Sequence, residues 1–275
     1  MSTSVDVAAW LNRVREARPL VHNITNLVVT NVAANGLLAI GASPVMAHAK
    51  QEVADMARIA GAVALNMGTL DEDIVEAMEL AGRAANGAGV PVVFDPVGVG
   101  ATPYRDEAAR RLTERVKLAM LRGNAGEIGV LIGAGGQVKG VDSEGAASDL
   151  PQAMRRYAEA RGCAVIATGP TDYVTDGRRV WALSNGHPLM AAITGSGCIA
   201  TAILGAFAAV ADRDQGPRAY AEAAVAALTC YNVAGQLAAD KAQGPGTFQA
   251  ALFDALYHLD GAYVKEVAKV EVLAE

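Results

Sequence analysis

The sequence has few cysteines, few aromatic residues and no long hydrophobic run. Its three cysteines, Cys163, Cys198 and Cys230, form no CxxC pair, which argues against a disulfide framework or a structural zinc site and suits a reducing compartment. The longest apolar run, 198–211, is shorter than the ~20 residues that span a bilayer. The N-terminal stretch has charges inside its apolar pattern, so it indicates an amphipathic helix and not a signal peptide. We therefore expect a soluble, cytoplasmic protein with no membrane contact.

Clusters of basic residues are also missing. The formal net charge of −6 is spread along the chain, without the Lys/Arg blocks and interleaved aromatics that follow a phosphate backbone, so we expect no nucleic-acid partner. An acidic chain can still bind a nucleotide where local donors and a metal ion neutralise the phosphates. The 275 residues are 52% hydrophobic and 19% charged, which excludes disorder and fits one domain, 1–275.

Short apolar runs alternate with helical patterns along most of the chain. The runs are 41–46, 61–69, 90–98, 116–124 and 163–170, and the helical patterns are 51–61, 71–88, 105–115 and Leu150–Arg161. This alternation predicts βαβ units and an α/β fold with a mostly parallel central sheet covered on both faces. Asp176-Gly177 between two alternating runs predicts a hairpin over 172–183, and helices are expected over 198–210 and 216–239.

The carboxyl ends of the predicted strands are the place to look for a ligand site, because open α/β sheets bind ligands there. The residues at those ends are Met46, Asn66, Asp95, Arg122, Asn124 and Thr168, and Glu127 follows one helical turn later. The two carboxylates and the arginine on one rim predict a phosphate and metal site. Structural roles stay open for both carboxylates: Asp95 could cap the loop before Pro96, and Glu127 could be a charge in the first turn of a helix.

The stretch TGSGC, 194–198, leads into the longest apolar helix. Gly195 and Gly197 let the backbone approach a ligand, and the helix N-terminus adds unpaired N–H donors, so the turn predicts an anion hole for a phosphoryl group. Cys198 falls in the first turn, where the helix lowers a thiol pKa, so we expect a partial thiolate that accepts the proton of an alcohol. The alternative is a small buried hydrophobe at a tight turn.

Other phosphate-binding motifs do not fit this turn. GSGCIA matches a G-x-G-x-x-A dinucleotide fingerprint, but it lies late in the chain and helical sequence follows where a second strand is needed. A Walker A sequence is absent.

Several segments together resemble one family, the hydroxyethylthiazole kinases, within the ribokinase-like superfamily. They are VHNITNLVVTNVAANGLLAIGASPVMAHA (21–49), DPVGVGATPYR (95–105), RGNAGEI (122–128), TGSGC (194–198) and GPGTF (244–248). The resemblance implies a three-layer α/β/α fold and phosphorylation, by ATP with Mg²⁺, of the primary alcohol of 4-methyl-5-(2-hydroxyethyl)thiazole in thiamine biosynthesis or salvage. The N-terminal sequence offers no β-rich lid, so we expect no separate lid domain.

The resemblance also assigns residues to the thiazole and to catalysis. Asn26 and Met46 would contact the thiazole, and Gly195 would line its hydroxyethyl end. Without the family, buried core is the stronger interpretation of Met46, and Asn26 could equally cap a helix starting near it. Cys198 stands where ribokinase-like enzymes usually carry Asp, with Gly195 and Gly197 completing the catalytic turn.

The nucleotide and the metal would be held on the neighbouring strand ends. Arg122 and Thr168, with Asn124 beside them, would hold the ATP phosphates, and arginine suits this role because it can bind a phosphate through two parallel hydrogen bonds. Asp95 and Glu127 would serve Mg²⁺ directly or through water, which fits the preference of this ion for oxygen ligands. The resemblance implies a homotrimer with active sites at subunit interfaces, where the neighbouring subunit keeps water away.

Three other readings compete with the thiazole kinase. One is a relative in the same superfamily, such as a hydroxymethylpyrimidine kinase or an NAD(P)H-hydrate dehydratase, of which the dehydratase is expected to keep Asp at the position of Cys198. Another is a thiazole- or thiamine-binding protein, which needs neither the carboxylate pair nor the anion hole. The last is a cysteine acyltransferase, which needs a histidine, such as His187, close to Cys198.

Overall fold

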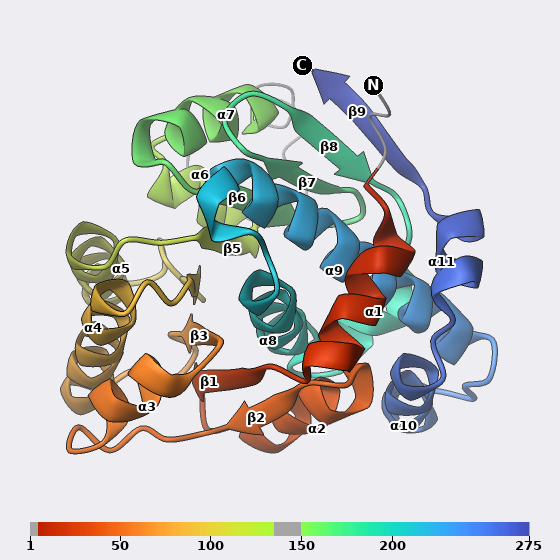
Figure 1. Cartoon of the computed structure of the whole chain (residues 1–275), viewed down its shortest axis with the longest axis horizontal. Coiled ribbons are helices and arrows are strands. Elements are labelled where there is room, and N and C mark those ends of the chain that lie inside the picture. Colours follow the sequence, from red (N-terminus) through yellow and green to blue (C-terminus); the bar gives the residue numbers. More distant parts are fainter. Residues whose placement is uncertain (1–4, 135–149, 275) are drawn as a thin grey trace.

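A computed structural model of the chain describes residues 5–134 and 150–274. One nine-stranded sheet runs through it in the order β2-β1-β3-β4-β5-β6-β7-β8-β9 (Figure 1). The strands are β1 Leu20–Ile24, β2 Ser43–Val45, β3 Ala62–Asn66, β4 Val92–Asp95, β5 Met120–Asn124, β6 Ala164–Thr168, β7 Asp172–Thr175, β8 Val180–Leu183 and β9 Val270–Ala274. Neighbours from β2 to β6 are parallel, and the pairs β6–β7, β7–β8 and β8–β9 are antiparallel.

Helices cover both faces of this sheet. The α-helices are α1 Val7–Ala17, α2 Thr30–Ile40, α3 Val53–Ile59, α4 Glu72–Gly87, α5 Pro103–Arg115, α6 Ala125–Leu131, α7 Leu150–Arg161, α8 Ser196–Ala209, α9 Pro217–Ala239, α10 Pro245–Tyr257 and α11 Gly261–Val267. Two short 3₁₀ helices, η1 Pro188–Ala192 and η2 Arg213–Gln215, flank α8. The mostly parallel, three-layer α/β/α architecture predicted from the alternating pattern is confirmed.

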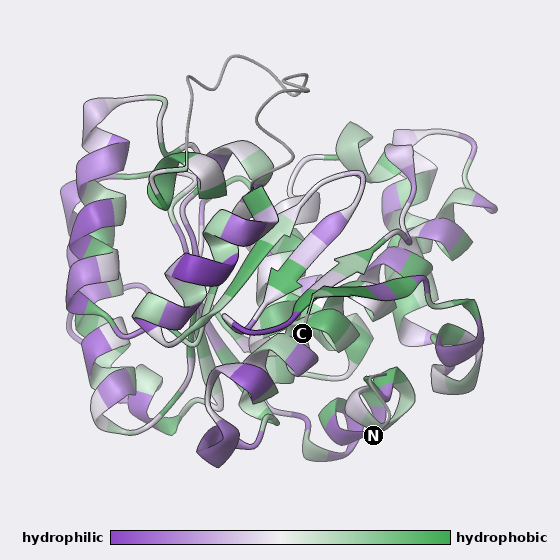
Figure 2. Ribbon diagram, turned by 90° about the horizontal axis from the view of Figure 1, so that it is seen from above, coloured by the Kyte–Doolittle hydropathy of each residue, from purple (hydrophilic) through white to green (hydrophobic). Residues whose placement is uncertain are grey.

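The two faces have separate hydrophobic cores. One core lies between the sheet and the helices α1, α2, α8, α9 and α10, and the other lies between the sheet and α3, α4, α5 and α7. Figure 2 shows mostly green strands between helices that carry purple, hydrophilic segments. The parallel strands are covered on both sides, which explains their continuous apolar runs: all five residues of β3 are buried.

The predicted strands 41–46, 61–69, 90–98, 116–124 and 163–170 correspond to β2 to β6, and the hairpin over 172–183 is β7 and β8. Its turn is made at Asp176, whose Oδ1 accepts from the backbone N–H groups of Arg178 at 2.8 Å and Arg179 at 2.7 Å. The predicted helices correspond to α3, α4, α5, α7, α8 and α9, with ends shifted by one or two residues in most cases. The longer connection before Cys163 falls partly on 135–149, outside the described residues.

Two strands carried no separate prediction. β1 lies between the N-terminal helix α1 and the helix α2. β9, near the C-terminal end of the chain, pairs with β8. The helix expected near Asn26 begins four residues later, at Thr30, because a turn intervenes in which Val29 N–H donates to the Asn26 carbonyl at 3.2 Å. Within the described residues, no helix is both long and apolar enough to cross a membrane.

Candidate active site

The alternation of side chains along the parallel strands selects the face on which the site forms. In β4, Phe94 packs into the core on the α4 side, whereas Val93 packs into the core on the α8 side. Asp95, two residues after Val93, therefore points toward α8. The same period brings three more polar residues to the α8 side at the ends of neighbouring strands: Asn66 on β3, Arg122 on β5 and Thr168 on β6.

The N-terminus of α8 meets these strand ends at a turn that only glycine permits. Gly195, the N-cap, has φ +84°, and a Cβ there would lie 2.6 Å from Val29 Cγ1. A Cβ on Gly197 would lie 2.8 Å from Arg122 Nη1. Tyr231 fastens the turn from α9, since its hydroxyl donates to the Ser196 carbonyl at 2.9 Å. The turn therefore presents the first N–H groups of α8, which lack intrahelical partners, beside a guanidinium.

Asp95 is fully buried at the centre of the cluster. Its Oδ2 accepts from Asn66 Nδ2 at 2.8 Å, Thr201 Oγ1 at 2.7 Å and Arg122 Nη1 at 3.2 Å. Burial raises the pKa of Asp95, and the opposing charge of Arg122 lowers it by less. Arg122 also donates from Nη2 to Thr168 Oγ1 at 2.6 Å, so the structure brings together three predicted residues from three strands.

Cys198 lies in the first turn of α8, as predicted, and is half-buried. Its Sγ accepts from Asn26 Nδ2 and from Asn66 Nδ2, both at 3.3 Å. The expectation of a lowered thiol pKa is wrong: burial, followed by the negative charge of Asp95, raises the pKa of Cys198. Removal from water and the charge of Asp95 cost the thiolate more than the two amide donors and the charge of Arg122 return.

Glu127 and Asn124 form a reciprocal capping box at the start of α6. Asn124 Oδ1 accepts from Glu127 N–H at 2.8 Å, and Glu127 Oε2 accepts from Asn124 N–H at 2.9 Å. Glu127 Oε1 accepts from Gly98 N–H at 2.8 Å, which ties the loop after β4 to α6. Glu127 is therefore a charge in the first turn of α6, as the structural alternative has it, and the capping box is an addition from the structure. Asp95 is different, because the partners of its side chain all belong to the cluster.

The donor set fits Mg²⁺. Asp95 Oδ1 is buried and has no hydrogen-bond partner, so one oxygen of this carboxylate is left for a cation or for water bound to one. Each oxygen of Glu127 accepts one backbone N–H and keeps capacity for another donor, such as a metal-bound water. Among the described residues no group of three or more His, Cys, Asp or Glu side chains forms a protein-only metal cage. A magnesium ion that keeps waters and nucleotide phosphates as ligands needs none.

The two residues assigned to the thiazole have different surroundings. Asn26 is buried and belongs to the cluster, because its amide also donates to Asn66 Oδ1 at 2.9 Å; it does not cap α2. Met46 is partly buried directly after β2, which is the edge strand beyond β1, and it packs against the core on the α8 side. Met46 is not a hydrogen-bond partner of Cys198, whose sulfur accepts from Asn26 and Asn66. His187 caps η1 and accepts from Leu189 N–H at 3.2 Å, and it is not a hydrogen-bond partner of Cys198.

Sequence reasoning missed two residues that organise the site. Thr201 stands three residues after Cys198, so helical periodicity places it on the same face of α8, and this signal could have found it. Arg105 closes the DPVGVGATPYR segment and donates to the carbonyls of Met67 and Val97, both at 2.7 Å, and of Gly68 at 2.9 Å. These hydrogen bonds connect the loop after β3 to the loop after β4. No sequence pattern indicates this role of Arg105.

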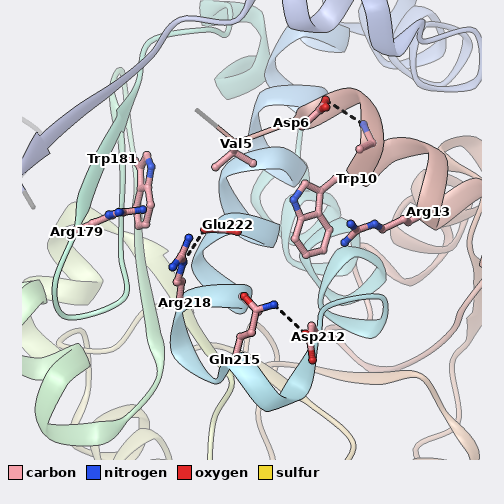
Figure 3. A pocket seen from close by; sticks show the side chains of 12 residues that line it. Val5, Asp6, Trp10, Arg13, Arg179, Trp181, Asp212, Gln215, Arg218 and Glu222 are labelled. Atoms are coloured by element: carbon pink, nitrogen blue, oxygen red, sulfur yellow. Dashed lines mark hydrogen bonds and ion pairs between the residues drawn. The ribbon is translucent and has the colours of Figure 1, made fainter. Parts of the chain in front are cut away.

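A hollow of about 290 Å³ lies away from the cluster, near the starts of α1, α9 and β8 (Figure 3). Both tryptophans line it, Trp10 and Trp181. Arg218 pairs with Glu222 at 2.9 Å, and Asp212 accepts from Gln215 at 2.8 Å. Because these charged groups bond to one another at helix starts, the strand-end cluster is the stronger candidate for chemistry.

Comparison with known proteins agrees with the fold and shows the family. The profile of the Hydroxyethylthiazole kinase family matches residues 11–262. A protein of Moorella thermoacetica (strain ATCC 39073 / JCM 9320) named hydroxyethylthiazole kinase is 51% identical over 273 residues, which cover 99% of this chain and 100% of that protein.

Two solved structures define the relationship further. That of a hydroxyethylthiazole kinase protein from Pyrococcus horikoshii OT3 has a TM-score of 0.87 and 42% identity, and the match covers 97% of this chain and 98% of that chain. A ribokinase-like superfamily protein from Enterococcus faecalis V583 shares the fold at a TM-score of 0.62 and 12% identity, over 97% of this chain and 90% of that one.

A mostly parallel sheet between two layers of helices defines an α/β protein with a ribokinase-like fold. The 51% identity with the Moorella thermoacetica protein over the full length and the match to the family profile identify the family within this fold. The chain belongs to the hydroxyethylthiazole kinase family.

Proposed function

We propose that this protein transfers the γ-phosphoryl group of ATP to the primary hydroxyl of 4-methyl-5-(2-hydroxyethyl)thiazole, in thiamine biosynthesis or salvage. The observation that carries the proposal is the convergence of Cys198, Asp95 and Arg122 at the glycine turn of α8. A proton acceptor, a carboxylate with a free oxygen and a buried cation lie together there, beside backbone N–H donors. Phosphoryl transfer to an alcohol needs these groups, since its catalysis is mostly positioning and electrostatic stabilisation.

The reaction follows from this arrangement. The hydroxyl oxygen of the alcohol attacks the γ-phosphorus of ATP, and its proton passes to Cys198 in its thiolate form, which becomes the neutral thiol. As the new O–P bond forms, the bond from the γ-phosphorus to the ADP oxygen breaks. Arg122 and the N–H groups from Gly195 to Cys198 stabilise charge on the transferred group, with Thr168 and Asn124 placing the nucleotide. Asp95 and Glu127 would hold Mg²⁺, directly or through water, and the ion would supply positive charge at the phosphates.

The thiazole would lie over the loop after β1. Asn26 offers an amide at the base of the cluster, Met46 offers a polarizable thioether for a flat ring, and Gly195 leaves room for the hydroxyethyl arm. The sulfur of Cys198 would then face the alcohol. Among the described residues no histidine forms a hydrogen bond with this thiol, which disfavours an acyltransferase.

We also propose that three copies assemble around this site. Leu27 and Val28, next to Asn26, are 77% and 67% exposed, and Leu38 on α2 is 57% exposed. Large apolar side chains beside a catalytic turn support a neighbouring subunit that covers them and excludes water. A single domain over 1–275 and a cytoplasmic location complete the proposal, supported by the continuous sheet from β2 to β9 and by the free cysteines.

A coupled ADP-release assay tests the proposed reaction. The protein is incubated with ATP and Mg²⁺ and with either hydroxyethylthiazole or hydroxymethylpyrimidine, each with and without EDTA. The expected result is turnover of the thiazole alone, which EDTA abolishes. Turnover of the pyrimidine alone would assign the related kinase, and thiazole binding without turnover of either alcohol would assign a binding protein.

A further inference from the structure

Asn66 joins the two halves of the cluster through one amide group. It is the last residue of β3, only 2% exposed, and it pairs in register with Asp95 on β4. Its Nδ2 donates to Asp95 Oδ2 at 2.8 Å and to Cys198 Sγ at 3.3 Å. The thiol and the carboxylate therefore share a single donor nitrogen, which has two hydrogens to give.

The orientation of this amide is held from its other side. Asn66 Oδ1 accepts from Asn26 Nδ2 at 2.9 Å and from the backbone N–H of Gly68 at 3.0 Å. A flipped amide would place Nδ2 against these two donors and Oδ1 against the carboxylate of Asp95. The network therefore admits one orientation, in which both hydrogens point toward Asp95 and Cys198.

The sulfur of Cys198 is consequently an acceptor on its protein side. Both of its hydrogen-bond partners are amide donors, Asn26 and Asn66. Two donors aimed at one sulfur favour a form that accepts hydrogen bonds, and they offset part of the cost of burying a thiolate next to Asp95. A sulfur held in this way is oriented to accept one more hydrogen, that of the alcohol.

We propose that Asn66 is a positioning residue for phosphoryl transfer: its locked amide holds the sulfur of Cys198 and the carboxylate of Asp95 in fixed relation, so that proton acceptor and phosphate site act on the same substrate. This inference rests on the proposed function and on the role of Cys198 within it. Asn66 itself touches neither substrate.

The test compares Asn66→Ala with a matched asparagine at the other end of the sheet. Asn86 on α4 also uses both ends of its amide, donating to the Lys117 carbonyl at 2.8 Å and accepting from Lys117 N–H at 2.7 Å. Asn66→Ala is expected to lower kcat by about 10- to 100-fold while the KM values for ATP and the thiazole change less than about threefold. Asn86→Ala is expected to leave kcat unchanged within about twofold.

A second readout needs neither nucleotide nor metal. Cys163 and Cys230 are buried and Cys198 is half-buried, so iodoacetamide modification of Cys198 can be followed by peptide mass spectrometry as a function of pH. In Asn66→Ala the alkylation profile should move to higher pH with the same plateau rate, and in Asn86→Ala it should not move. A changed plateau with an unmoved profile would mean that Asn66 only controls access, and the inference would be wrong.

Two further variants keep the result decisive. Asn66→Asp preserves the size of the side chain and loses the shared donor, so a fold intact by circular dichroism with the same loss of kcat supports the inference even if the alanine variant misfolds. Wild-type kcat in Asn66→Asp overturns it. Cys198→Ala separates the two proposals: if it stays fully active, the proposed role of Cys198 fails, whereas an inactive Cys198→Ala beside fully active Asn66 variants refutes the role of Asn66 alone.

Discussion

Arg122 and Asp95 form a buried ion pair between neighbouring strand ends, with Nη1 and Oδ2 3.2 Å apart and side-chain exposures of 10% and 0%. The second nitrogen of the guanidinium, Nη2, is bonded to Thr168 Oγ1 at 2.6 Å. Burial lowers the pKa of Arg122, but the charges of Asp95 and Glu127 outweigh burial and raise it, so the guanidinium stays cationic. A fixed positive charge thus lies between Asp95 and Thr168, the residues that we propose for the metal ion and the nucleotide.

Replacing Arg122 by lysine removes the planar guanidinium, whose two terminal nitrogens donate to Asp95 and Thr168. For Arg122→Lys we expect kcat/KM for ATP to fall by about 10²-fold, since one ammonium cannot replace two directed donors. Steady-state kinetics with varied ATP measures the loss. The exposed Arg110 provides the control, because Arg110→Lys should leave kinetics unchanged. Equal kinetics for Arg122→Lys and wild type would contradict the assignment.

Cys198→Ser tests the proton acceptor. A hydroxyl is a poorer base than a thiolate, so kcat should fall by about 10²-fold while nucleotide affinity stays nearly intact. Because burial and Asp95 raise the pKa of Cys198, the wild-type rate should increase as pH rises from neutral to alkaline, and the serine variant should lose this increase. The comparison uses kcat against pH and calorimetric ATP binding. Loss of ATP binding in the variant would speak against the role.

Asp95→Asn tests the fit to magnesium. The substitution keeps the side-chain shape and removes the charge next to the unpartnered Oδ1 position, so the Mg²⁺ concentration for half-maximal activity should rise by about tenfold or more. Titration of activity with MgCl₂ after EDTA treatment gives this value. Asp55→Asn, on the exposed surface of α3, serves as the control. An unchanged magnesium requirement would remove Asp95 from the metal site.

Glu79 provides a stability test away from the site. It joins α4 to α5 by accepting from Arg111 Nε at 2.8 Å and Arg115 Nη1 at 3.0 Å. Burial raises the pKa of Glu79, but the hydrogen bonds from the two arginines outweigh burial and lower it. This stabilisation is present above the pKa of unfolded glutamate, ~4.3, and is lost as pH falls through the lower folded value.

Glu79→Gln should therefore reduce the free energy of unfolding by about 1–3 kcal/mol at pH 7 and by less at acidic pH. Denaturant titrations at both pH values measure the difference. Glu107→Gln removes an exposed pair with Arg110 and should cost under about 1 kcal/mol. A Glu79→Gln effect that does not depend on pH would exclude the charge as its cause.

Val28→Asp tests the proposed trimer. Placing a charge on the exposed apolar patch beside Asn26 should weaken assembly, so light scattering should shift from three times the chain mass toward one, with loss of activity. Ile59→Asp, at a side chain 70% exposed on α3, is the control and should stay trimeric. A fully active monomer of the unmodified protein at assay concentration would refute the interface site.

The sequence alone determined the strand-end residues of the site. Alternating apolar runs place Asp95 and Thr168 at strand ends, and the glycines around Ser196 mark the turn of α8, because periodicity and backbone restrictions are local properties. The position of Glu127 in the first turn of α6 is equally local, which is why it could be foreseen from the sequence.

Only the tertiary structure decided how these residues act on one another. Three contacts depend on how segments distant in sequence pack together. They are the bond from Asn66 to Cys198, the bond from Thr201 to Asp95 and the bond from Arg105 to the Met67 carbonyl. The thiol pKa of Cys198 was predicted in the wrong direction for the same reason. A helix N-terminus is visible in the sequence, whereas desolvation and a neighbouring carboxylate arise only when separate segments pack together.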